Sequence, residues 1–111
     1  MKLIKLNEVP EQGVSHNSAI RKRVLVENGE IPGITNYARA IFPPGEKAGD
    51  HLHNDMAEVF TAEAGCGEIR INDVAYVFAA GTTVVVEPGE VHEIINTGDS
   101  ELVVTYFGVV V

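Results

Sequence analysis

Residues 45–65 read GEKAGDHLHNDMAEVFTAEAG, and the pair His51 and His53 within them is the feature that most strongly indicates the fold. In an extended strand, residues two positions apart point to the same face of the sheet. A strand over 51–53 would therefore bring both imidazoles to one point, whereas a helix would send them to nearly opposite sides. The stretch predicts β structure and a pair of metal ligands.

Glu58 and His92 are the other two side chains expected at this point. Glu58 lies five residues after His53, an odd offset that a continuous strand would turn to the opposite face. A turn at Asn54-Asp55 would let the chain restart with Glu58 facing the same interior, and His92 lies on a later predicted strand. Three imidazoles and one carboxylate suit Mn, Fe, Co, Ni, Zn or Cu rather than Ca or Mg.

The rest of the chain alternates short segments rich in Val, Ile, Thr, Tyr and Phe with turns rich in Gly, Pro, Asn and Asp. This pattern is typical of an all-β sandwich or barrel. Asn72-Asp73 could close a tight hairpin, because both residue types tolerate left-handed backbone conformations. The expected strands are 2–6, 21–27, 34–42, 51–53, 57–64, 67–72, 74–79, 82–87, 91–96 and 101–110.

Length and charge limit the class of protein. A chain of 111 residues fits a single domain over 1–111. The net charge of −8 opposes binding to phosphate backbones, which needs clustered Lys and Arg. The only tight basic cluster, Arg21-Lys22-Arg23, is interpreted as the solvated face of a strand. We therefore expect no nucleic-acid partner.

The location of the protein is predicted from its cysteine content and apolar segments. Cys66 is the only cysteine, so no intrachain disulfide can form, and this fits a reducing compartment. Lys5 interrupts the apolar N-terminus, which therefore does not read as a signal peptide. No apolar run approaches the roughly 20 residues of a membrane helix. We expect a cytoplasmic protein without membrane association.

The glycines around the histidine pair resemble the first motif of the cupins, G-x5-H-x-H-x3,4-E-x6-G. Every fixed place of that motif is matched, by Gly45, His51, His53, Glu58 and Gly65. Residues 81–96 are similar to the second cupin motif, G-x5-P-x-G-x2-H-x3-N. Its matching places are Gly81, Gly89, His92 and Asn96. Glu87 stands at the proline position and Pro88 follows one residue later.

The resemblance implies a double-stranded β-helix, or jelly-roll, barrel of the small single-domain type. It also implies one divalent transition metal (Mn, Fe, Ni, Zn or Cu) bound by His51, His53, Glu58 and His92. A homodimer is a further implication. The glycines of the two motifs and Asn96 are expected to shape turns rather than to take part in chemistry.

Five side chains are candidates for the pocket above the metal. Phe60 shares the strand parity of Glu58, and Ile94 shares that of His92, although core filling is the other interpretation of both. Tyr106 is a polar-tipped candidate on the last strand.

The remaining candidates, Tyr37 and Arg39, share one face of the predicted strand 34–42. If they point inward, Arg39 would favour an anionic substrate, because its guanidinium matches a carboxylate. If they point outward, Ala38 and Ala40 leave space for the pocket.

Two functions are compatible with such a site. The first is a metalloenzyme of dioxygenase or isomerase type that acts on a small oxygenated molecule, either enolisable or a carboxylate. Glu58 would then serve as ligand, as catalytic base, or as both. The second is a non-catalytic cupin that binds or senses a small ligand. A fold does not decide between them, but a further base inside the pocket would favour the enzyme.

Overall fold

The computed structural model describes residues 1–111 and contains ten β-strands and one 3-10 turn, η1. Each strand pairs antiparallel with its neighbours. The elements are η1 (Leu6–Glu8), β1 (Glu11–Val14), β2 (Asn17–Val26), β3 (Ile34–Phe42), β4 (Lys47–His51), β5 (Met56–Ala64), β6 (Cys66–Ile71), β7 (Val74–Ala79), β8 (Thr83–Val86), β9 (His92–Ile95) and β10 (Leu102–Val110).

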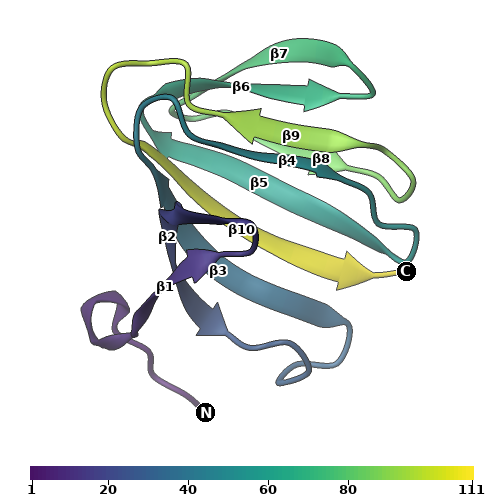
Figure 1. The fold of residues 1–111 in the computed structure, drawn as a ribbon. Coiled ribbons are helices and arrows are strands. Elements are labelled where there is room, and N and C mark those ends of the chain that lie inside the picture. Colours follow the sequence, from purple (N-terminus) through teal and green to yellow (C-terminus); the bar gives the residue numbers. More distant parts are fainter.

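Two sheets face each other (Figure 1). The larger has the order β1-β2-β3-β10-β5-β8, and the smaller has the order β4-β9-β6-β7. From β3 onward the chain passes repeatedly from one sheet to the other, so strands next to each other in space are often distant in sequence. This arrangement confirms the predicted all-β, jelly-roll barrel.

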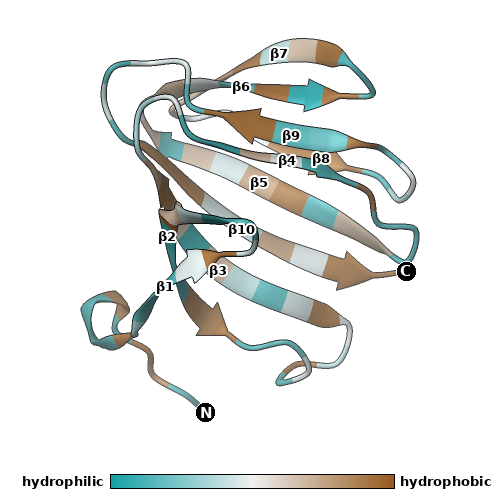
Figure 2. Ribbon diagram, in the orientation of Figure 1, coloured by the Kyte–Doolittle hydropathy of each residue, from teal (hydrophilic) through white to brown (hydrophobic).

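The core lies between the two sheets, where the strands turn alternate side chains inward. On β3 the inward residues are Ala38, Ala40 and Phe42, which are at most 3% exposed. From the smaller sheet, Ile69 and Phe78 are fully buried against them. Hydrophobic and hydrophilic segments accordingly alternate along the strands (Figure 2).

Local turn chemistry explains how the strands connect. Asn72 and Asp73 have φ values of +48° and +67° and join β6 to β7, which confirms the predicted tight hairpin. Asn96 is 1% exposed, and its amide nitrogen donates to the carbonyls of Phe42 and Ser100. Asn96 therefore ties two loops together, the structural role expected of it.

The predicted strand over 2–6 is wrong. Residues before η1 form no strand, and the first strand is β1, which the sequence pattern did not predict. Leu3 and Ile4 are 79% and 40% exposed. Their apolar character resembles a strand, but no neighbouring strand of this chain pairs with them, and unpaired backbone groups do not make a sheet.

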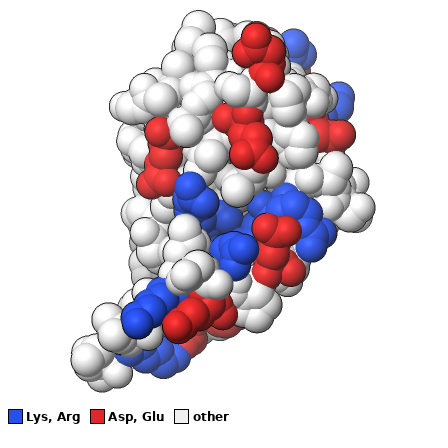
Figure 3. Space-filling view, turned by 90° about the vertical axis from the view of Figure 1, so that its left-hand side faces the viewer, with Lys and Arg blue, Asp and Glu red and all other residues white.

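The charged surface mixes both signs. Figure 3 shows Lys and Arg side chains in a band across one face, with Asp and Glu beside them. Glu11 forms ion pairs with both Arg21 and Arg23 on the exposed side of β2. The structure contains no helix with the length and hydrophobicity needed to span a membrane.

Candidate metal centre

Glu58 lies between two imidazoles in the interior of the barrel. Its Oε1 is 3.1 Å from Nε2 of His92 and 3.5 Å from Nε2 of His53. Ligand atoms of these three residues all lie within 4.8 Å of one another, so the group could hold a metal ion. The side chains of His92 and Glu58 are only 5% and 12% exposed, which limits competition from water.

His51 lies beside this group. Its ring centroid is 5.9 Å from that of His92 and 6.3 Å from that of His53, and the His53 and His92 rings are themselves 5.9 Å apart. The three imidazoles therefore form a nearly equilateral triangle. The ligand atoms of His51 fall outside the 4.8 Å group, so binding of one ion by all four side chains would need the His51 ring to turn inward.

His51 and His53 do not share a strand, contrary to the prediction of a strand over 51–53. β4 ends at His51, and its register with β9 shifts between Ala48 and His51, where Asp50 has a φ of +44°. Such an irregularity re-aims the side chains that follow it. His53 lies in the next loop, where its carbonyl accepts a 2.7 Å hydrogen bond from the Gly89 amide. His51 therefore lies at the end of a bulged strand, and His53 lies in the loop that follows it.

The other two members of the cluster are placed by regular structure. The chain bends at Asn54-Asp55, as predicted, and β5 then carries Glu58 on its inner face. His92 is the first residue of β9 and pairs directly with His51 in the register of the smaller sheet. Gly108 of β10 pairs with Glu58 in the register of the larger sheet, and a side chain at this position would clash with Thr35 and Met56.

The pKa values of two histidines move in opposite directions. Burial, followed by the proximity of His92 and His53, lowers the pKa of His51 below its ordinary value. Burial also acts to lower the pKa of His92, but the hydrogen bonds to Glu58 and to the Glu90 carbonyl outweigh it and raise the pKa. The position beside Glu58 therefore favours positive charge, whether from a proton or from a metal ion.

The donor spacing fits a first-row transition metal. Two ligand atoms about 2.1 Å from a common ion lie about 3.0 Å apart in octahedral geometry and about 3.4 Å apart in tetrahedral geometry. The two separations measured from Glu58, 3.1 and 3.5 Å, agree with these values. Imidazoles with one carboxylate suit several such metals, and the donor set alone does not select one.

A cavity of about 490 Å³ opens beside the cluster, inside the barrel. All four cluster residues line it, together with three of the predicted pocket candidates, Phe60, Ile94 and Tyr106. Phe60 stacks on Tyr106 with ring centroids 5.6 Å apart and lies 5.7 Å from the His92 ring. Burial, with the nearby charge of Glu58, raises the pKa of Tyr106 to about 12, so its hydroxyl stays protonated at neutral pH.

Tyr37 and Arg39 do not line this cavity, which corrects their inclusion as pocket candidates. The parity of β3 turns Ala38 and Ala40 inward and leaves Tyr37 and Arg39 on the outer face. Arg39 pairs there with Glu63, and Tyr37 packs edge-on against Phe107. The second of the two orientations considered for this strand is therefore the one observed, and the small alanines leave room for the cavity.

Lys22 is a cavity residue that the sequence analysis missed. The sequence places Lys22 in a basic triplet with Arg21 and Arg23, but a strand turns the middle residue of a triplet to the opposite face. Lys22 shares the parity of Ile20 and Val24, which are buried. Alternation along β2 was the signal that could have found it.

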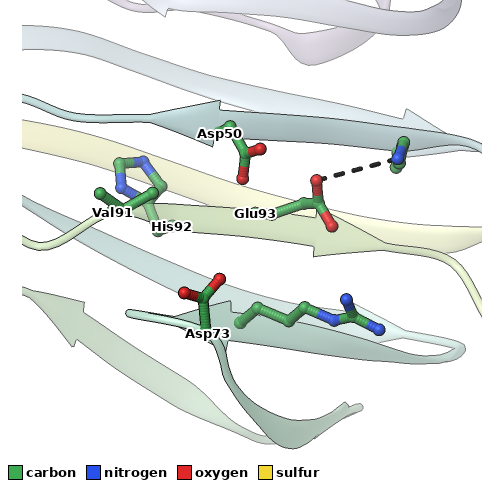
Figure 4. A pocket seen from close by; sticks show the side chains of 7 residues that line it. Asp50, Asp73, Val91, His92 and Glu93 are labelled. Carbon is green, nitrogen blue, oxygen red and sulfur yellow. Dashed lines mark ion pairs between the residues drawn. The ribbon is translucent and has the colours of Figure 1, made fainter.

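A second, smaller pocket of about 220 Å³ lies on the outer face of the smaller sheet. Figure 4 shows Asp50 and Asp73 facing β9 from opposite sides, with Glu93 on that strand. Glu93 is buried and is 4.0 Å from the Lys47 ammonium. We call this the outer pocket. His92 borders both the outer pocket and the cavity. Its Nε2 faces Oε1 of Glu58 inside the barrel, so the candidate metal-binding group belongs to the cavity.

Known proteins with similar sequences and structures support one family. The family model of the cupin domain matches residues 38–110. An oxalate-binding protein from Thermotoga maritima is 33% identical over 66 residues, which span 60% of this chain and 54% of that protein. The match thus covers only about half the length of this relative.

Solved structures show the same fold. A predicted oxalate decarboxylase from Thermotoga maritima superimposes with a TM-score of 0.93 at 22% identity, covering 99% of this chain and 100% of that one. A cupin 2 conserved barrel domain protein from Salinispora arenicola gives a TM-score of 0.78 at 19% identity, covering 97% and 87% of the two chains. At these identities the likeness shows the fold alone. Together with the family match, it shows that this chain belongs to the cupin domain family.

Proposed function

We propose that this chain binds a small carboxylate at a divalent transition metal held by the His/Glu cluster, which comprises His51, His53, Glu58 and His92. The observation that carries the proposal is the convergence of three imidazoles and one carboxylate at the edge of a 490 Å³ cavity. The oxalate-binding relative supports the choice of ligand class.

The charge of the site supports an anionic ligand. A divalent ion beside one carboxylate and neutral imidazoles leaves a net positive charge, and when bound it would act as a Lewis acid toward carboxylate or keto oxygens. The protonated Tyr106 hydroxyl can donate a hydrogen bond to such a ligand from the cavity wall. Its stacking on Phe60 holds the phenol ring in place.

A second candidate function is a metalloenzyme of dioxygenase or isomerase type that acts on the bound molecule. Glu58 is the feature that favours it, because the carboxylate is largely buried, borders the cavity and is positioned by two imidazoles. A carboxylate held in this way can take a proton from an enolisable substrate. Tyr106 is a poor base at neutral pH because its pKa is about 12.

Calorimetric titration of the metal-loaded protein with oxalate and larger carboxylates tests the first candidate. We expect saturable binding that is lost when the metal is chelated and lost in Glu58→Gln. Glu63→Gln is the matched control, because Glu63 lies on the same strand with an exposed, outward side chain. Absence of carboxylate binding by the metal-loaded wild type would overturn the proposal.

Turnover assays separate the second candidate from the first. Oxygen uptake and NMR analysis of each bound carboxylate should reveal a product if the site is catalytic. Binding without any product would support the first candidate, carboxylate binding, and exclude the second. The homodimer and the cytoplasmic location stay predictions, which analytical ultracentrifugation and cell fractionation would test.

A further inference from the structure

We infer that Lys22 is a second anion-recognition point in the metal cavity, so that the site selects dicarboxylates over monocarboxylates. This inference rests on the proposed carboxylate-binding function and adds to it a specificity-determining residue. It concerns a side chain that is neither a metal ligand nor part of either cupin motif.

The orientation of Lys22 distinguishes it from the other basic residues of β2. Arg21 and Arg23 point outward, where Glu11 pairs with both. Lys22 lies between them, on the parity of the buried Ile20 and Val24, and it lines the cavity. The fold therefore places one basic side chain of this strand in the wall of the cavity.

Lys22 has no partner within the protein. No carboxylate lies within 4.0 Å of its ammonium, and it makes no side-chain hydrogen bond, although most other basic side chains of the chain are paired. The acidic residues that line the same cavity are Asp55, at its exposed rim, and Glu58, in the metal cluster. A lysine in the cavity wall without a counterion is available to an anionic ligand.

The neighbours of Lys22 leave room for such a ligand. Ala40 is opposite Lys22 in the register of β2 and β3, and it ends at Cβ. On the other side of β3, Ala40 pairs with Val104 of β10. A row of short side chains therefore lines the wall from Lys22 toward the centre of the sheet. Both residues line the cavity.

The position of Lys22 selects the shape of the ligand. Lys22 is on β2 and Glu58 is on β5, with β3 and β10 between them in the larger sheet. The strand registers place Ala62, four residues beyond Glu58 on β5, in line with Lys22. Three strand spacings of about 14 Å across the sheet and about 13 Å along β5 therefore separate Lys22 from Glu58, before the curvature of the sheet and the length of the lysine stem shorten the gap. A ligand that reaches both points must therefore carry two separated anionic groups, as succinate, glutarate and adipate do.

The surrounding charge increases the importance of this one cation. The chain has a net charge of −8, which repels anions at a distance. A metal that binds one carboxylate group of a longer diacid, from succinate to adipate, leaves the second carboxylate group without a partner. An ammonium at the other side of the cavity supplies that partner.

Calorimetric titration with matched ligands tests this role. Each dicarboxylate from succinate to adipate is compared with the monocarboxylate of equal chain length, for example glutarate with pentanoate. We expect metal-loaded wild type to prefer at least one dicarboxylate by about tenfold to a hundredfold, the range of one charge-assisted hydrogen bond. Lys22→Met should abolish that preference while leaving monocarboxylate affinity and metal content unchanged.

Lys5→Met is the matched control, because it removes the same charge from an exposed lysine without an ion pair. It should retain the dicarboxylate preference of the wild type. Lys22→Arg should restore part of the preference, and circular dichroism verifies folding of each variant. A preference unchanged in Lys22→Met, or no preference in the wild type, would overturn the role of Lys22. Failure of the wild type to bind any carboxylate would instead overturn the proposed function itself and with it this inference.

Discussion

Glu58→Gln should remove most of the stabilisation that a bound metal gives to the folded protein. Glu58 is the only carboxylate of the cluster, and its Oε1 is 3.1 and 3.5 Å from the two neighbouring imidazoles. The substitution keeps the size of the side chain and removes its charge. A neutral amide oxygen is a weaker ligand for a divalent cation than a carboxylate, so affinity for the metal should fall.

The size of the effect follows from linkage. At a metal concentration about 100 times Kd, binding to the folded state adds about 2.7 kcal/mol to the free energy of unfolding. Unfolding entropy is about 2.1 cal/mol/K per residue, so for 111 residues this corresponds to a rise in Tm of about 12 °C. Loss of a ligand should weaken binding by at least about 100-fold, since loss of an outer partner alone costs about 10–100-fold. The same metal concentration would then raise Tm by only about 2 °C.

Differential scanning calorimetry of chelator-treated protein, with and without added metal, measures this difference. The quantity compared is the metal-induced change in Tm within each protein, so that any change in the stability of the metal-free variant cancels. Glu63→Gln, on the outer side of the same strand, should keep the full shift. An equal shift in Glu58→Gln and wild type, or no shift of the wild type with Mn, Fe, Co, Ni, Zn or Cu, would refute the reasoning.

Three further predictions concern the metal-free barrel and the cavity wall. Gly67→Ala should lower the free energy of unfolding by about 1–3 kcal/mol, because the added Cβ would lie 2.5 Å from a backbone carbonyl oxygen of β9; an unchanged urea midpoint would contradict this. In the metal-free protein, NMR titration should place the pKa of His51 below 6.5 and that of His92 above it. Because the pKa of His51 is lower in the folded protein, the free energy of unfolding decreases as pH falls through 6.5 and below. His92 instead adds stability below pH 6.5, and this stability is lost as pH rises through its folded-state pKa. A raised pKa of His51 and a lowered pKa of His92 would show that Glu58 does not hold His92 as described. Tyr106→Phe should weaken carboxylate binding by about threefold to tenfold, the range of one neutral hydrogen bond, without loss of metal, and unchanged affinity in calorimetry would exclude the hydroxyl as a donor.

Much of the fold could be predicted from the sequence, because strand alternation and turn residues are local signals. The segments at 34–42 and 74–79 coincide with β3 and β7. The strand predicted over 2–6 was wrong, because an apolar pattern does not reveal whether a partner strand exists. Leu3 and Ile4 have none within this chain.

The His/Glu cluster could be predicted better from the spacing of the cupin motifs than from the parity of side chains along a strand. The prediction of one strand over both His51 and His53 was wrong, because β4 ends at His51, just after a register shift in which Asp50 has a positive φ. Asp tolerates a left-handed conformation, but the spacing of the two histidines does not indicate where the strand ends. Lys22 was overlooked for a different reason, since its sequence neighbours suggested a surface cluster while its strand parity pointed inward.

A crystal structure of the metal-loaded protein, with anomalous diffraction at the absorption edge of the metal, tests the central claim most directly. The claim predicts one anomalous peak per chain inside the barrel, about 2.0–2.3 Å from ring nitrogens of the three histidines and from a Glu58 oxygen. It also predicts that the His51 ring turns toward the ion. A structure without a peak in the cavity, or with its main peak in the outer pocket near Asp50, would contradict it.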